Sequence, residues 1–341
     1  MKSVVFFNNK GGVGKTTLTC NVVSYLSQQK NKRVLLVDAD PQCNATQSLL
    51  TEDECIDLYK DHPKAHKTLF NYLSTIEAGE AAIGGPIDPL LGTQNKFGTD
   101  LIPGHPHLSL VEDKLSGAWS DMLGGTPAGY RITNWCSQLF QEIENRYDLV
   151  VFDVGPSLGA LNRTVILSAD YVVTPLGCDI FSLLGVQNIS SWMGKWKTQY
   201  DRSIRQFGED RPELVGQYPI IMDTAEKFRF AGYSVQQYVT RSFKTGPRAV
   251  KAYDRILADI PGIINQSLPQ LRPARTAIDT IELGDIPFLY SLVPLAQSQH
   301  SPIHQLDKNA RLVGSQIRQV AAYKELMNGF CDRLLSNMGV K

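Results

Sequence analysis

One glycine-rich segment constrains the fold and the chemistry of this chain more than any other. Its sequence is Lys10-Gly11-Gly12-Val13-Gly14-Lys15-Thr16-Thr17. It follows the apolar run Val4–Phe7, and the residues after it place Leu18, Val22 and Leu26 on one helical face. A strand, a glycine loop and a Lys-Thr pair that opens a helix are the context that a phosphate-binding loop requires.

The backbone of this loop matters as much as its side chains. Glycines let backbone N–H groups turn inward around phosphate oxygens, and the helix dipole adds positive potential at the same place. We therefore expect Gly11–Thr17 to bind a nucleotide, with Lys15 at the β- and γ-phosphates and the Thr16 hydroxyl on Mg²⁺. The alternative is a glycine-rich turn with an accidental Lys-Thr pair.

Short apolar runs alternate with longer amphipathic segments, which is typical of a mostly parallel sheet with crossover helices. Most runs are continuous, as expected for strands covered on both faces. We therefore expect a three-layer α/β fold, a twisted sheet with helices on both faces, closed by helix within Asn309–Met338. The predicted strands are Val4–Phe7, Val34–Val37, Phe97–Ile102, Leu149–Val154, Tyr171–Pro175, Phe288–Val293 and one within Phe228–Gln237, with Pro219–Met222 as a further candidate.

Composition excludes several classes of protein. The 341 residues carry 34 Lys+Arg against 34 Asp+Glu, and 43% are hydrophobic, so the chain is neither disordered nor low in complexity. Its six cysteines show no CxxC spacing, which favours isolated reduced thiols over a disulfide framework or a zinc site. The first apolar run is too short for a signal peptide, and no run of about 18 apolar residues occurs. We expect a cytoplasmic protein without membrane insertion.

Carboxylates stand at the ends of two predicted strands. Asp38 and Asp40 close the run Val34–Val37, and Asp153 lies near the end of Leu149–Val154. The carboxyl ends of strands face the crevice in which open α/β sheets bind ligands. A carboxylate there can reach a water in line with the γ-phosphate, or a metal beside it. The alternative for Asp38 and Asp40 is a capped turn after a strand, and the alternative for Asp153 is an ordinary buried strand that ends in Asp.

Together these segments resemble the ParA/MinD/Soj superfamily of deviant Walker A ATPases, P-loop NTPases of the SIMIBI-like type, and most closely its ParA-type partition ATPases. Lys10 completes the pattern K-G-G-x-G-K-[ST]. Asp38–Thr46 is similar to the switch I pattern D-x-D-P-Q-x-N-x-T. Asp153–Gly159 is similar to the switch II pattern D-x-P-P-S-x-G, with Gly155 where the family usually has its first proline.

The resemblance implies a role for each of these residues. Lys10 would cross a dimer interface and contact the partner's nucleotide. Asp40 would polarise the attacking water, Asp38 would hold the water shell of Mg²⁺, and Asp153 would lie beside the metal with Thr16. The expected ligands are ATP or ADP and Mg²⁺. Base contacts would come from Pro294 and from the pair Gln236-Gln237, of which Gln237 is the residue chosen.

The recognisable stretches are 1–50, 145–190 and 285–340. We expect one P-loop ATPase domain over 1–341, with family-variable insertions at about 52–130 and 191–285. The second insertion is basic: residues 191–255 carry 12 basic and 7 acidic side chains. Arg241, Lys244, Arg248, Lys251 and Arg255 follow at intervals of three and four, with a helix expected to start near Pro247.

This basic segment has two interpretations. It is either a nucleic-acid footprint, with Arg248, Lys251 and Arg255 as candidate DNA contacts, or a solvated face.

Four functions are compatible with these motifs. The favoured one is an ATP-dependent dimerising Mg-ATPase of the ParA type, free in the cytoplasm or associated with the nucleoid. It would bind DNA non-specifically, respond to an adaptor that stimulates hydrolysis, and act in plasmid or chromosome partition or cargo positioning. Alternatives are a MinD-like membrane-recruited ATPase, a metabolic or cluster-carrying P-loop protein, and a regulatory or defence module. A module without hydrolysis is hard to reconcile with Lys10, Lys15 and Asp40.

Overall fold

The computed structural model describes residues 1–60, 67–238, 240–243, 246–249, 258–264, 266, 281–306 and 312–340. In these residues a seven-stranded sheet, parallel throughout, runs in the order β3-β2-β4-β1-β5-β6-β9. Its strands are β1 (Lys2–Phe6), β2 (Val34–Ala39), β3 (Asp100–Ile102), β4 (Leu149–Val154), β5 (Tyr171–Gly177), β6 (Arg229–Tyr238) and β9 (Ile286–Pro287).

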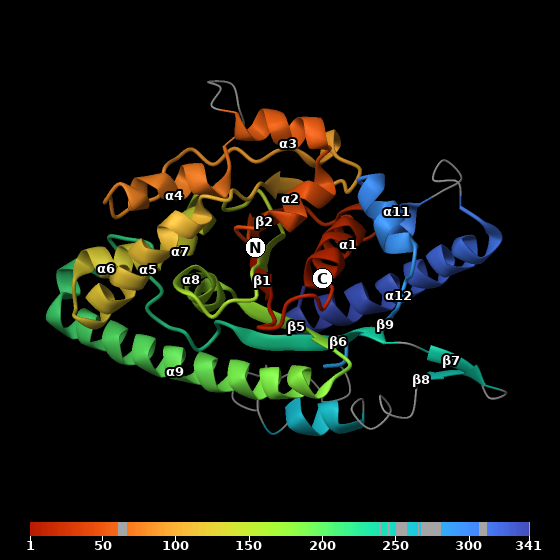
Figure 1. Cartoon of the computed structure of the whole chain (residues 1–341). Coiled ribbons are helices and arrows are strands. Elements are labelled where there is room, and N and C mark those ends of the chain that lie inside the picture. The colour runs from red at the N-terminus through yellow and green to blue at the C-terminus, as the bar shows by residue number, and fades with distance from the viewer. Residues whose placement is uncertain are drawn as a thin grey trace.

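Helices cover both faces of this sheet, as the alternating pattern predicts (Figure 1). One face carries α1 (Lys15–Gln29), α2 (Asn44–Leu49), α3 (Glu52–Tyr59), α11 (Leu292–Ser298) and α12 (Gly314–Met338). The other carries α4 (Leu69–Glu77), α5 (Leu108–Leu123), α6 (Pro127–Thr133), α7 (Trp135–Glu142), α8 (Ala160–Ser168) and α9 (Ile180–Asp210). Each face buries its own apolar core against the strands. The three-layer α/β fold is therefore confirmed.

Two of the predicted strands are wrong. Phe288–Val293 is not a strand, because pairing ends at Pro287 and Tyr290 has a φ of 47°, outside the β region. Phe288 and Tyr290 are also largely exposed. Pro219–Met222 forms no strand, because the two edges of β6 already pair with β5 and β9.

The segment 52–130 contains more regular structure than its turn-forming residues suggest. The predicted strand near Phe97–Ile102 is β3, and the expected short helices are present. One of them, α5, is 16 residues long and buries Leu108, Val111 and Leu115 against the sheet. This segment therefore contributes part of the core.

The basic segment differs from its prediction. β7 (Thr240–Phe243) and β8 (Gly246–Ala249) form an antiparallel hairpin in which Arg248 lies opposite Arg241. The prediction of a helix that starts near Pro247 is wrong, because Gly246–Ala249 pairs as a strand. A two-stranded hairpin tolerates Pro247, although proline has no N–H group to donate to the partner strand. Lys244, Lys251 and Arg255 lie outside the described residues.

The closing helix is α12, and it is a packed helix. Met327, Phe330 and Leu334 on it are fully buried in the same core as α1. Within the described residues, no helix combines the length and the apolar character that crossing a membrane requires.

Candidate functional site

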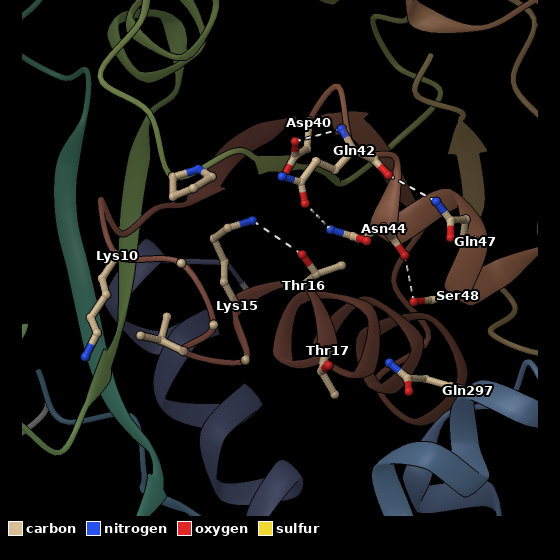
Figure 2. A pocket seen from close by; sticks show the side chains of 15 residues that line it. Lys10, Lys15, Thr16, Thr17, Asp40, Gln42, Asn44, Gln47, Ser48 and Gln297 are labelled. Atoms are coloured by element: carbon tan, nitrogen blue, oxygen red, sulfur yellow. Dashed lines mark hydrogen bonds between the residues drawn. The ribbon is translucent and has the colours of Figure 1, made fainter. Parts of the chain in front are cut away.

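Parallel pairing brings the carboxyl ends of β1, β2 and β4 together. Asp153 of β4 is in register with Phe6 on one side and with Asp38 on the other. The glycine loop follows β1 and ends at Lys15, the first residue of α1. A cavity of about 420 Å³ opens at this edge, between the loop, Asp40 and the start of α2 (Figure 2).

The loop has the backbone geometry that its glycines predict. Gly12 and Gly14 have φ angles of 75° and 76°, a left-handed conformation that suits glycine. A Cβ placed on Gly11 or Gly12 would meet no described atom within 4 Å. Gly14 caps α1 without a side chain, so the first N–H groups of the helix can receive an anion. Gly11–Thr17 all line the cavity.

Lys15, Thr16 and Asp153 form a buried polar cluster. The Nζ of Lys15 lies 2.7 Å from Oδ1 of Asp153, and the Thr16 hydroxyl donates to Oδ2 at 2.8 Å. Lys15 is only 8% exposed and Asp153 is fully buried. Charged groups persist at such depth only when they are paired, and this pair holds both at the head of α1.

Asp38 is buried beside this cluster. Its Oδ2 accepts hydrogen bonds from the N–H of Thr46 at 2.8 Å and from the Thr46 hydroxyl at 2.7 Å. Burial, and then the neighbouring charge of Asp153, raises the pKa of Asp38 to about 7, against the effect of the Thr46 bonds. The carboxyl is therefore held in an environment that disfavours its own negative charge.

Asp40 lines the cavity itself. Its Oδ1 accepts the N–H of Gln42 at 2.9 Å, while its side chain faces the cavity that Lys15 also lines (Figure 2). Burial raises the pKa of Asp40, although the Gln42 bond and the charge of Lys15 act in the other direction. A carboxylate in this position can accept a proton from a water inside the cavity.

The residues present fit a Mg²⁺ ion. Three carboxyl groups meet at this edge of the sheet, those of Asp38, Asp40 and Asp153. Lys15 is the cation that contacts Asp153. The charge of Asp153 contributes to the raised pKa of Asp38 and of Asp40. A divalent cation would relieve this repulsion. No cluster of three or more His, Cys, Asp or Glu among the described residues could hold a metal by itself. A Mg²⁺ ion does not need such a cluster, because several of its ligands are water molecules and phosphate oxygens of the nucleotide.

Lys10 lies on the outer side of the loop. Its Nζ contacts Oδ2 of Asp179 at 2.5 Å, and the side chain points away from Lys15 and Asp40 (Figure 2). Asp179 caps α9 by accepting the N–H of Ser182. Partial burial opposes its ionisation, but the bond from Lys10 and the Ser182 N–H hold the pKa of Asp179 below its usual value.

A second cavity of about 280 Å³ adjoins the first, and the two share Gly14 and Thr17. Pro294 lines it, as do Gln236, Phe288 and Tyr290. The side chain of Gln237, the predicted base contact, lies outside the described part of the chain. An apolar cavity beside the phosphate loop has the composition that a nucleobase requires.

Sequence reasoning missed Gln297 at the first cavity and Tyr323 at the second. They come from α11 and α12, far from the loop in sequence, and neither lies in a local motif. Tyr323 is 3% exposed and lines the second cavity from α12.

The three candidate DNA residues are described only in part. Arg248 lies in the hairpin, with its backbone described and its side chain outside the described atoms, and Lys251 and Arg255 fall in undescribed residues.

Comparisons with known proteins agree with this geometry. A protein-family model described as an AAA domain matches residues 1–206. A virulence plasmid ParA family protein from Chlamydia psittaci is 27% identical over 265 residues, covering 74% of this chain and 88% of the relative. The chromosome-partitioning ATPase Soj from Thermus thermophilus is 29% identical over 208 residues, covering 61% and 68%. The crystal structure of protein DIP2308 from Corynebacterium diphtheriae aligns with a TM-score of 0.75 at 30% identity, covering 99% of both chains.

Proposed function

This chain belongs to the AAA-domain family and to the ParA/MinD/Soj superfamily of P-loop ATPases, and we propose that it is an ATP-dependent, dimerising Mg-ATPase switch of the ParA type. In its ATP state it would bind DNA non-specifically and respond to an adaptor protein that stimulates hydrolysis. Its role would be plasmid or chromosome partition, or the positioning of another cargo, in keeping with the names of its relatives.

The observation that carries this proposal is the convergence of Lys15, Thr16, Asp38, Asp40 and Asp153 at the head of α1. Nucleotide phosphates would meet the N–H groups of the loop. Lys15 would exchange its bond to Asp153 for the β- and γ-phosphates. Thr16, Asp153 and Asp38 would then hold Mg²⁺, directly or through its waters, and the ion would neutralise charge on the transferred phosphoryl group. Asp40 would orient the attacking water.

The surface around Lys10 supports dimerisation. Phe181, Leu184 and Trp192 lie on one face of α9 and are 69%, 48% and 41% exposed. This row begins next to Asp179, the residue that holds Lys10. An apolar row beside a half-exposed lysine is a suitable contact surface for a second copy. The lysine could then exchange Asp179 for the partner's nucleotide.

Phosphate release in the presence of Mg²⁺ tests the hydrolase. In the Asp40→Ala variant ATP should remain bound, because Lys15 and the loop are intact, while turnover falls about hundredfold or more through loss of the general base. Asp57→Ala is the matched control, since Asp57 forms only an exposed pair with Lys60 at 2.9 Å. Wild-type turnover in Asp40→Ala would remove this residue from catalysis.

The DNA half of the proposal rests on charge. Residues 191–255 carry a net charge of +5, and the hairpin places Arg241 opposite Arg248. Binding through phosphates should be independent of sequence, steeply salt-dependent, and stronger with ATP because a dimer doubles the basic surface.

An anisotropy titration at two salt concentrations, with ATP and with ADP, tests this. Reversal of Arg248, Lys251 and Arg255 to Glu should abolish duplex binding and leave ATP binding intact. A charge-matched control reverses Lys60, Lys67 and Lys96 to Glu. Undetectable duplex affinity at low salt in both nucleotide states would leave the basic segment as a docking or solvated face. Binding to liposomes instead would favour the membrane-recruited alternative, which the packed α12 does not support.

A further inference from the structure

The helix that follows β4 is capped by a residue from another part of the chain. α8 begins after Gly159, which has no side chain to cap it. Glu112 of α5, 48 residues away, supplies the cap: its Oε1 accepts the N–H of Ala160, and its Oε2 accepts the N–H of Leu161 at 3.0 Å. A helix N-terminus usually takes its acceptor from the residue that precedes it.

Two further observations show how closely α5 approaches α8. A Cβ on Gly159 would lie 2.1 Å from Oε1 of Glu112, so this position accepts a side chain only if Glu112 moves. One turn further along α8 and two turns further along α5, the guanidinium carbon of Arg163 lies 4.4 Å from the centre of the Trp119 ring. The first turn of α8 is therefore held to α5 at two points.

The first turn of α8 also holds the loop Gly155–Gly159, which reaches the cavity through Pro156. Asn162 on α8 is 2% exposed, and its Nδ2 donates to the carbonyls of Gly155 at 2.8 Å and Ser157 at 2.7 Å. Gly155 packs against Asp40, since a Cβ there would lie 3.3 Å from Oδ1 of that residue. Pro156 lines the cavity. A continuous set of contacts thus runs from α5 through α8 to Asp40.

We propose that Glu112 is a positioning residue for ATP hydrolysis: its carboxylate ties the first turn of α8 to α5, and Asn162 of that turn holds the Gly155–Ser157 loop, so Glu112 sets the place of Asp40 and Pro156 at the cavity. This inference rests on the proposed ATPase function. This positioning role differs from that of a simple helix cap. A cap stabilises α8 whichever part of the chain supplies the acceptor, whereas a tether must come from α5. The tether makes the loop and α5 move as one unit.

A pair of variants separates the tether from the cap. Glu112→Ala removes both. Adding Gly159→Ser restores a cap from the helix's own residue, because the space taken by Oε1 is now available and serine is a preferred N-cap. Glu112→Ala should lower Tm by roughly 2 °C and kcat by about tenfold or more, with the Kd for ATP unchanged. In the double variant Tm should recover while kcat stays low.

The matched control is Asp113→Ala, the next residue on α5, which is exposed. It should leave both Tm and kcat at their wild-type values. If kcat recovers with Tm in the double variant, or never falls in Glu112→Ala, the positioning role is wrong and Glu112 is only a cap.

Hydrogen exchange separates failure of this inference from failure of the proposed ATPase. The loop amides of Gly155 and Ser157–Gly159 should exchange faster in both variants, whereas the amides of the first turn of α8 should exchange faster only in Glu112→Ala. This readout needs no hydrolysis. Loop amides that keep wild-type rates in the double variant would overturn the tether, even in a protein that proves unable to hydrolyse ATP.

Discussion

Two lysines of one glycine loop, five positions apart, lie in opposite electrostatic environments. Lys15 is 8% exposed and contacts a fully buried carboxylate, Asp153, at 2.7 Å. The side chains of Lys10 and its partner Asp179 remain 37% and 34% exposed at a similar distance of 2.5 Å. Contact distance alone does not distinguish the two pairs, but burial does.

This difference determines which lysine can leave its carboxylate while no nucleotide or Mg²⁺ is bound to compensate the charge that it leaves behind. Removing one member of a buried pair leaves an uncompensated charge, and this typically lowers the free energy of unfolding by about 3–5 kcal/mol. An exposed pair contributes about 0–1 kcal/mol, because water and salt replace either partner. Lys15 therefore belongs to the interior of its own chain, while Lys10 can leave Asp179 at small cost, as a role in a second subunit requires.

The largest effect should follow Lys15→Ala. Without nucleotide, the free energy of unfolding should fall by about 3 kcal/mol, because Asp153 stays buried beside Asp38 with no cation. ATP binding should be lost with the cation that contacts the phosphates. Denaturant unfolding and an ATP titration measure the two effects.

Lys60→Ala is the control, since Lys60 pairs with Asp57 in an exposed bridge at 2.9 Å. A loss of stability no larger than that of this control would show that the Lys15 pair is not the buried contact described above.

His304 extends the comparison of the two lysine pairs to a buried ionisable group that has no counter-ion among the described residues. It lies in a short 3₁₀ turn, Ile303–Gln305, with its ring edge-on to Tyr25 at 5.2 Å, and its ring nitrogens have no hydrogen-bond partner among the described residues. Burial, and secondarily the charge of Lys324, lowers the pKa of His304 to about 4. The folded state therefore keeps this ring neutral where the unfolded chain protonates it.

Stability should consequently fall as the pH drops from about 6.5 towards 4, because only the unfolded state binds the proton in that window. The full loss is about 3 kcal/mol. His304→Leu should remove this part of the pH dependence, while the exposed His107→Leu should retain it. Parallel pH profiles for wild type and His304→Leu would contradict the depressed pKa.

The smallest effect on folding should follow Lys10→Ala. Its free energy of unfolding should stay within about 1 kcal/mol of wild type, and ATP should still bind, because Lys15 is unchanged. Hydrolysis and ATP-dependent dimerisation should be lost if Lys10 acts on the partner's nucleotide. Light scattering with ATP, on the Asp40→Ala background that retains nucleotide, measures dimerisation. An ATP-dependent dimer that survives the loss of Lys10 would refute the role in the second subunit.

Much of the nucleotide site could be predicted, because its parts are contiguous in sequence. The strand, the glycines and the helix start lie within the first 30 residues, so their geometry depends mainly on local backbone preferences. The same holds for β4, whose continuous apolar run matches a strand covered on both faces. Phe288–Val293 shows the limit, since its apolar run predicts a strand, whereas the structure ends the strand at Pro287 and places these residues beside a cavity.

The sequence by itself determined the phosphate loop, the places of the main strands along the chain and the carboxylates at their ends, because each follows from short-range periodicity and the conformational freedom of glycine. Only the tertiary structure decided which groups meet. Strand register placed Asp38 beside Asp153, burial separated Lys15 from Lys10, and helix packing brought Glu112 to α8. The hairpin of the basic segment was likewise decided by pairing with a neighbouring strand. Contacts between distant segments depend on how whole helices and strands pack together, and this packing cannot be predicted from the spacing of residues along the chain.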